Sequence, residues 1–202
     1  MNPGPSTSPN DMDPLDFAPA TTSMARLVTR VRDDQLTART PCPDYTVADL
    51  VDHIGGLAFA FTASARKGEV PGGGGSGDGS RLEEGWRERI VAQLAELTDA
   101  WRDPAAYDGL TMAGPLEMPA EVAALVAMNE VVVHGWDLAR STGQRFEVDE
   151  RAATACLGFA QSFEAPASDE GGPFGPPVPV PADADVLDRL VGATGRDPSW
   201  TP

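Results

Sequence analysis

Apolar residues recur every three to four positions over several long stretches of the chain, which is the spacing of one face of an α-helix. Segments rich in proline and glycine separate these stretches, and no alternation with a period of two is sustained. The pattern therefore predicts an all-α protein. The predicted helices run from Phe17 to about Leu36, Val47 to about Lys67, about Arg81 to Trp101, about Pro119 to Ser141 and Asp149 to Phe163, followed by a short amphipathic stretch from Val186 to Val191.

Residues that favour helix ends support two of these boundaries. Thr46, with Asp49 three residues later, predicts an N-cap and an acidic first turn for the second long helix. Pro119 suits the first turn of the fourth helix, and Gly143 suits the cap at its C-terminal end.

The segments between the helices predict how the chain is organised. Its 202 residues suit a single domain, which we place at 14–202, after a disordered lead-in over 1–13. Residues 103–116 are expected to form a loop or a short extended excursion, and 166–181 to be mostly extended. The glycine-rich stretch 72–80 lacks the Lys-Ser/Thr ending of a phosphate-binding loop, so it is interpreted as a flexible connector.

Charge and composition narrow the choice of partners and compartment. The formal net charge is −16, and so acidic a surface repels phosphate backbones and anionic membranes. No uninterrupted apolar run approaches the roughly 18 residues of a membrane span, and the first ten residues lack the features of a signal peptide. Two cysteines are too few for a disulfide framework. We expect a cytoplasmic monomer or homodimer that binds neither nucleic acid nor membrane.

The two histidines of the chain both lie within predicted helices. His53 shares a face with its apolar neighbours, and His134 follows Glu130 by four residues, so these two side chains leave one side of the fourth helix. Three valines directly follow Glu130, and burying an ionised carboxylate costs several kcal/mol unless it is paired or bound to a cation. Arg140, the nearest cation on that helix, is about 15 Å away.

A metal ion bound by these residues would resolve the problem. Two imidazoles and one carboxylate form the ligand set of open zinc sites, in which the fourth position takes water or substrate. Nickel, cobalt and iron also suit these ligands. Hydrogen-bonded core histidines and a surface Glu-His pair explain the same spacing, and on spacing alone both interpretations stay open.

Three segments resemble a known family. TPCPDYTVADLVDHIGG (40–56) is similar to the second-helix motif of DinB-like bundles and, more closely, to the N-terminal domain of mycothiol-dependent maleylpyruvate isomerases. NEVVVHGWDLARSTGQ (129–144) is similar to their fourth-helix motif, and 175–200 resembles the C-terminal signature of a single-domain, metal-binding subset. The resemblance implies a DinB-like four-helix bundle with additional C-terminal helices and long Pro/Gly loops. It also implies metal ligands at His53, Glu130 and His134.

The same resemblance implies an activity. It indicates a metal-dependent transferase or isomerase that uses a small-molecule thiol, mycothiol, with an electrophilic substrate. The isomerases carry a second domain that contributes to their active site, and this sequence shows no counterpart of it. A metal-binding scaffold or partner-binding module without turnover therefore stays open as an alternative.

Several neighbouring residues are candidates for supporting roles. Asp137 lies one turn after His134, where it could orient a ligand imidazole, or serve as the general base if the protein were a metal-hydroxide hydrolase. Trp136 is a candidate to line the pocket, although a core role is the usual one for tryptophan. Cys42, just before the second helix, is either a reactive or a packed structural thiol, and Cys156 is expected in the core.

Overall fold

The computed structural model describes residues 14–70, 75–163 and 174–202, so the predicted lead-in over 1–13 lies outside the described residues. Within these ranges the chain is mainly helical, which confirms the all-α prediction. The α-helices are α1 (Ala18–Arg30), α2 (Val47–Ala65), α3 (Trp86–Trp101), α4 (Ala120–Thr142), α5 (Glu150–Gln161) and α6 (Val186–Ala193); the 3-10 helices are η1 (Asp33–Gln35), η2 (Gly79–Arg81) and η3 (Pro104–Tyr107); the strands are β1 (Leu110–Ala113) and β2 (Leu116–Pro119).

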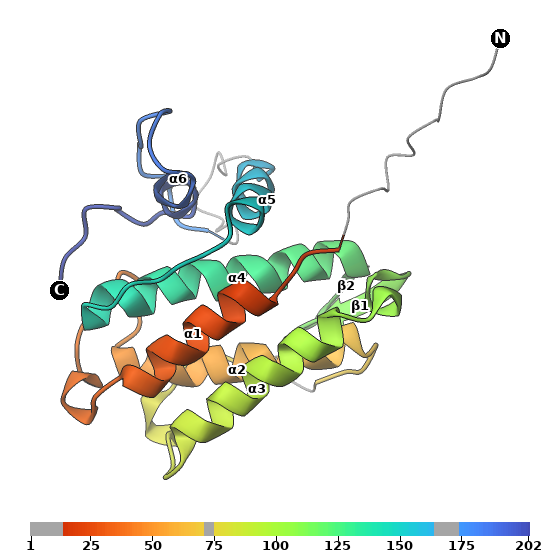
Figure 1. Cartoon of the computed structure of the whole chain (residues 1–202), viewed down its shortest axis with the longest axis horizontal. Coiled ribbons are helices and arrows are strands. Elements are labelled where there is room, and N and C mark those ends of the chain that lie inside the picture. The colour runs from red at the N-terminus through yellow and green to blue at the C-terminus, as the bar shows by residue number, and fades with distance from the viewer. Residues whose placement is uncertain (1–13, 71–74, 164–173) are drawn as a thin grey trace.

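The first four helices form a bundle, as expected for a DinB-like fold (Figure 1). Both α1 and α2 pack against α3 and α4, so α1 and α2 lie on opposite sides of the bundle. Each helix supplies large, fully buried side chains to one shared core, and burying each such side chain stabilises the fold by about 1.5–3 kcal/mol. Representative members are Met24, Leu27, Leu50, Ile90, Leu94, Met128 and Leu138.

The two C-terminal helices cover the outer side of α4 (Figure 1). They pack against each other, and α4 is therefore enclosed by the bundle on one side and by α5 on the other. This position explains why α4 is apolar almost all round. By length and composition α4 could cross a membrane, but 78% of its most apolar stretch is buried inside the fold, as in the core helix of a soluble protein.

Some boundaries differ from the predicted ones for local reasons. The first helix ends at Arg30 instead of about Leu36, because Val31 is extended and η1 forms a separate turn. The third helix starts at Trp86 instead of about Arg81, because Gly85 has a left-handed φ of 78°. Strands β1 and β2 form an antiparallel hairpin where a loop or short extended excursion was predicted.

The predicted caps are present. The Thr46 hydroxyl accepts from the Asp49 backbone N–H, and the Asp49 carboxylate accepts in return from the Thr46 N–H at 2.9 Å. Gly143 ends α4 with a left-handed φ of 68°. Pro119 is the residue just before α4 and also the last residue of β2, so the hairpin leads directly into the helix.

Candidate metal centre

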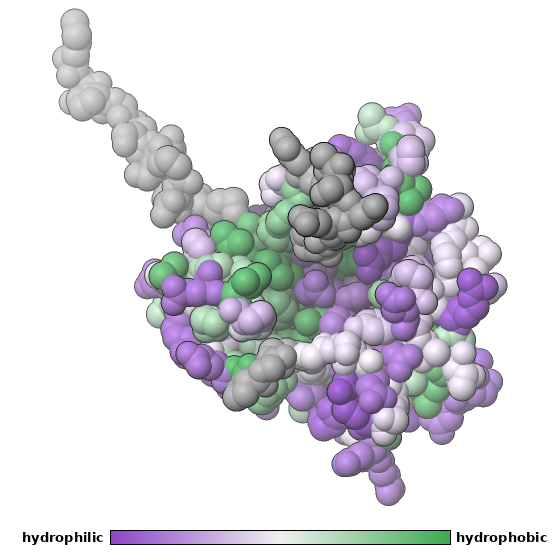
Figure 2. Space-filling view, turned by 180° about the vertical axis from the view of Figure 1, so that it is seen from behind, coloured by the Kyte–Doolittle hydropathy of each residue, from purple (hydrophilic) through white to green (hydrophobic). Residues whose placement is uncertain are grey.

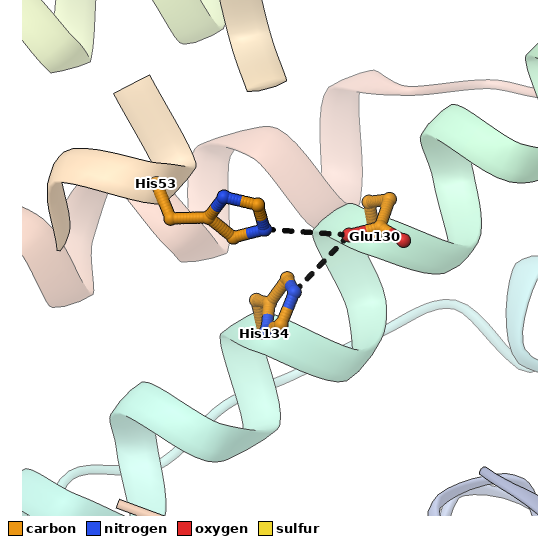
Figure 3. A group of neighbouring side chains, drawn as sticks. All are labelled: His53, Glu130 and His134. Carbon is orange, nitrogen blue, oxygen red and sulfur yellow. Dashed lines mark ion pairs between the residues drawn. The ribbon is translucent and has the colours of Figure 1, made fainter. Parts of the chain in front are cut away.

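The three candidate ligands converge between α2 and α4. His53 lies in the middle of α2, while Glu130 and His134 lie one turn apart on α4, and these two helices pack side by side. One nitrogen or oxygen atom from each residue lies within 4.8 Å of those of the other two. The Nε2 atoms of His134 and His53 lie 3.1 and 3.9 Å from Oε2 of Glu130 (Figure 3). The spacing argument and the resemblance therefore identified residues that the fold brings together.

The opposite nitrogen of each imidazole is committed elsewhere. Nδ1 of His53 donates to the backbone carbonyl of Gly75 at 3.2 Å, and Nδ1 of His134 donates to Oδ2 of Asp137 at 3.0 Å. Because a carbonyl and a carboxylate only accept, each Nδ1 carries the hydrogen. The Nε2 atoms are left to face one another and the Glu130 carboxylate, which is the arrangement that metal-ligating histidines need.

Charge and burial set the protonation of this cluster. Burial and the nearby His134 lower the pKa of His53, so His53 is neutral at pH 7. Burial alone would lower the pKa of His134, but its hydrogen bonds to Asp137 and Glu130 raise it to about 9. Burial alone would raise the pKa of Glu130, but the hydrogen bond from His134 and the charges of both histidines lower it. The site thus holds a positive charge between its carboxylates.

Asp137 has a second partner that the sequence did not reveal. Its carboxylate is fully buried and accepts from Nη2 of Arg196 at 3.1 Å as well as from His134. Burial would raise the pKa of Asp137, but the His134 hydrogen bond and the Arg196 charge lower it, so this carboxylate is ionised. Arg196 lies in the segment after α6, and its side chain is 14% exposed.

The segment after α2 packs onto the site instead of behaving as a free connector. Besides the Gly75 carbonyl on His53, Gly77 N–H donates to the Tyr45 hydroxyl at 3.0 Å, and Gly79 N–H donates to Asp49 at 2.8 Å. The Tyr45 ring lies 5.2 Å from that of His53. The described part of the glycine-rich stretch, 75–80, is therefore built against α2; its remaining residues lie outside the described ranges.

The other candidates take different positions. Trp136 is buried, and the Cζ atom of the Arg140 guanidinium lies 5.6 Å from the centroid of the Trp136 ring. Trp136 lies on α4, two residues after His134. Its role in lining the pocket stays a prediction. Cys42 is half-buried, and burial raises the pKa of its thiol. The nearby Arg196 charge acts in the opposite direction and lowers this pKa, whereas the Asp137 charge raises it. Cys156 is fully buried, as expected.

Comparison with known families decides the relationship. The family described as "Mycothiol maleylpyruvate isomerase N-terminal domain" matches residues 17–139, which include all three candidate ligands. The chain belongs to this family. Over 191 residues it is 32% identical to uncharacterized proteins of Mycobacterium tuberculosis strains CDC 1551 and H37Rv, covering 92% of this chain and 98% of each relative.

Solved structures of the family support the fold. The chain is similar to the crystal structure of the mycothiol-dependent maleylpyruvate isomerase, with a TM-score of 0.53 and 16% identity. It is also similar to that of a histidine-to-alanine mutant of the isomerase, with a TM-score of 0.54 and 17% identity. Each likeness covers 71% of this chain but only 64% of the isomerase chain. At this identity the structures bear on the fold, and the activity of the isomerase does not transfer with it.

Proposed function

We propose that the protein binds one divalent metal ion, with zinc the favoured ion, through His53, Glu130 and His134. We further propose that it uses this ion to activate a small-molecule thiol, such as mycothiol, in the transfer or isomerisation of an electrophilic substrate. The observation that carries the proposal is the convergence of two Nε2 atoms and one carboxylate whose supporting contacts are already in place. The thiol part of the proposal is supported by membership in a family whose description names mycothiol.

The donor set fits such an ion. Three protein ligands leave a coordination position open, whereas structural zinc sites are usually closed by four. A divalent ion in this position supplies Lewis acidity, which lowers the pKa of a ligating thiol until the thiolate forms. The residues of the chain hold and orient: His53 and His134 present Nε2, and the backbone of Gly75 and the Asp137 carboxylate fix the two ring orientations.

The surroundings of Asp137 favour an orienting role over that of a general base. Its oxygens face His134 and Arg196, and its side chain has no exposed surface, so a water molecule in the open position would not reach it. The thiol-activating function is therefore better supported than a metal-hydroxide hydrolase. Because the structural likeness covers only 64% of the isomerase chain, a metal-binding protein without turnover is the second candidate.

Metal content tests the site. Reconstituted protein should hold about one equivalent of zinc per chain, and His134→Ala should lose it. Glu130→Ala should also weaken binding, whereas Glu121→Ala, an exposed glutamate in the first turn of the same helix, should leave it intact. Stoichiometric zinc in His134→Ala would show that the site is elsewhere.

Cobalt substitution tests the thiol. Cobalt(II) bound to a thiolate gives a sulfur-to-metal charge-transfer band in the near ultraviolet. Adding mycothiol to the cobalt form should produce this band with saturation in the wild type and in Cys42→Ser. If metal binds but no thiol produces the band, the thiol-dependent function is wrong and the non-catalytic metal-binding protein takes its place. A band present before thiol addition and lost in Cys42→Ser would make Cys42 a ligand.

A further inference from the structure

The chain of contacts around the metal centre does not end at the family-matched part of the sequence. Asp137 is the last link within residues 17–139, and it is held in turn by Arg196, which lies 59 positions further along. The guanidinium approaches with two nitrogens: Nη2 lies 3.1 Å from Oδ2 of Asp137, and Nε lies 3.4 Å from Oδ1. This two-point contact fixes the plane of the carboxylate as well as its charge.

We propose that Arg196 is a positioning residue of the metal centre, which acts through Asp137 to hold the His134 imidazole with Nε2 toward the metal. The inference rests on the metal site proposed above. It assigns a role in that site to the C-terminal segment, which lies outside residues 17–139 that the N-terminal domain of the family matches.

Charge balance explains why Arg196 is needed. A histidine that ligates a metal is neutral, so it cannot compensate the buried Asp137 carboxylate by itself. Without Arg196, the buried Asp137 carboxylate would have no cation beside it and would turn toward water. That movement would release Nδ1 of His134. With Arg196 in place, two guanidinium nitrogens hold the carboxylate where Nδ1 of His134 meets it.

The backbone after α6 is shaped to deliver this side chain. Gly195 has a left-handed φ of 86° and lies so close to Gly175 that a Cβ atom would approach the Gly175 backbone to 2.9 Å. The turn is closed by the Arg196 N–H, which donates to the Val191 carbonyl at 2.8 Å, and Nη1 of Arg196 donates to the Thr194 carbonyl at 2.9 Å. These contacts hold the Arg196 guanidinium in the orientation in which it contacts Asp137.

A purely structural role for Arg196 is the competing explanation, and the chain offers a matched control for it. Arg140 on α4 also ties the C-terminal segment to the bundle, because its guanidinium donates to the carbonyls of Pro198 and Trp200 at 3.1 and 2.6 Å. Among the described residues, none of the contacts of Arg140 is with Asp137 or the candidate ligands. Losing Arg140 therefore weakens the attachment of the segment and leaves the contact to Asp137.

The test compares Zn²⁺ affinity, by competition with a chromogenic chelator, in the wild type, Arg196→Ala, Arg196→Lys and Arg140→Ala. Loss of a contact that orients a ligand typically weakens metal affinity 10- to 100-fold, so we expect a loss of that size in Arg196→Ala. Arg196→Lys should recover part of it, since lysine restores the charge but not the two-point contact. Arg140→Ala should stay within about twofold of the wild type. The Co²⁺ ligand-field spectrum should change in Arg196→Ala and stay unchanged in Arg140→Ala.

The outcomes separate this inference from the proposed function. If the wild type itself binds no metal, the proposed function fails. If the wild type binds and Arg196→Ala matches it, or if Arg196→Ala and Arg140→Ala lose affinity equally, the positioning role is overturned while the metal site stands. Should Arg196→Ala lack helical circular dichroism, Asp137→Asn decides the matter, because it removes the charge that Arg196 meets and leaves an oxygen for Nδ1 of His134. Unchanged affinity and Co²⁺ spectrum in folded Asp137→Asn would overturn the proposal.

Discussion

The Nδ1 atom of His53 lies 3.2 Å from the carbonyl oxygen of Gly75, so a backbone group of the loop after α2 orients one of the candidate metal ligands. The other histidine is oriented by a side chain, Asp137. The two imidazoles therefore depend on different parts of the fold. The loop that carries Gly75 is also held by Asp52, whose carboxylate accepts from the Asp78 N–H at 3.1 Å and from Arg81 at 2.6 Å.

Gly77→Ala should weaken metal binding without touching a ligand. A Cβ atom at this position would lie 2.1 Å from the Asp49 carbonyl oxygen and 3.1 Å from Cβ of His53, so the loop has to move away from α2. The Gly75 carbonyl would move with it and release His53. We expect about a 10- to 100-fold loss of Zn²⁺ affinity, the usual result of losing a contact that orients a ligand.

Gly158→Ala is the control for this prediction. Gly158 lies in α5, where an added Cβ atom would meet nothing within 4 Å. Alanine there should leave Zn²⁺ affinity unchanged and stabilise the helix by up to about 1 kcal/mol. Wild-type affinity in Gly77→Ala would mean that the loop contact does not orient His53.

Asp49→Asn should make the free energy of unfolding less dependent on pH below about pH 4. Hydrogen bonds from the Thr46 hydroxyl and from backbone N–H groups, including that of Gly79, lower the pKa of Asp49. A carboxyl whose pKa is lower in the folded state stabilises the fold above its unfolded pKa of about 4, and this contribution is lost as the pH falls through the folded pKa. At pH 7 the substitution should cost about 0.5–1 kcal/mol of unfolding free energy.

Denaturant unfolding at pH 7 and near pH 3 measures this difference. The difference in unfolding free energy between wild type and Asp49→Asn should be smaller near pH 3 than at pH 7. Asp44→Asn, which removes the same charge from an exposed position outside the helix cap, should change the free energy little at either pH. A gap that widens in acid would reverse the sign and contradict the assignment.

How much of this structure the sequence could predict depends on the range of the interactions. The helices follow from local apolar spacing, and the ligands stand out because the chain has only two histidines, one of them four residues after a buried-type glutamate. The early end of α1 was missed because Val31 continues the apolar spacing although its backbone is extended. Short strands such as β1 carry too few residues for a period to show.

The contacts that support the site could not be read from local patterns. Arg196 is one arginine in a loop, and its pairing with Asp137 across 59 positions leaves no periodic signal. The carbonyl of Gly75 is a backbone group and has no residue-type signature at all. The capping pair Thr46 and Asp49 did predict a helix start, but its second use, holding Gly79 beside the site, depends on where the loop returns.

The environments of the two cysteines predict slow reactions with alkylating reagents. Burial raises the pKa of Cys156 to about 12 and also raises that of Cys42, which is half-buried. The thiolate is the reactive form, so native protein at neutral pH should react with iodoacetamide slowly at Cys42 and not at Cys156. In denaturant both should react as free cysteine does. Cys42→Ser and Cys156→Ser assign the two reactions.

The alkylation result also bears on the source of the reactive thiol. If Cys42 is modified more slowly than free cysteine, the chain has no activated thiol at that position, and an external thiol is the better candidate to reach the metal. Modification faster than free cysteine would mean that the nearby Arg196 dominates over burial, and it would make Cys42 a nucleophile in its own right.

The fold should survive removal of the metal. Its buried cluster draws on every helix of the bundle and does not depend on the three ligands, unlike small zinc domains that unfold without their ion. Metal at about 100 times its dissociation constant adds about 2.7 kcal/mol to the stability of the folded state. For a chain of this size that corresponds to a rise in Tm of about 5–10 °C. Chelated protein should therefore keep its helical circular dichroism at room temperature and melt lower by this amount. His134→Ala is the control for this shift. Its melting temperature should be the same with and without metal, because the substitution removes the site while leaving the rest of the core in place. Chelated wild type without helical signal would show instead that the metal organises the bundle, and the centre would then be structural as well as functional.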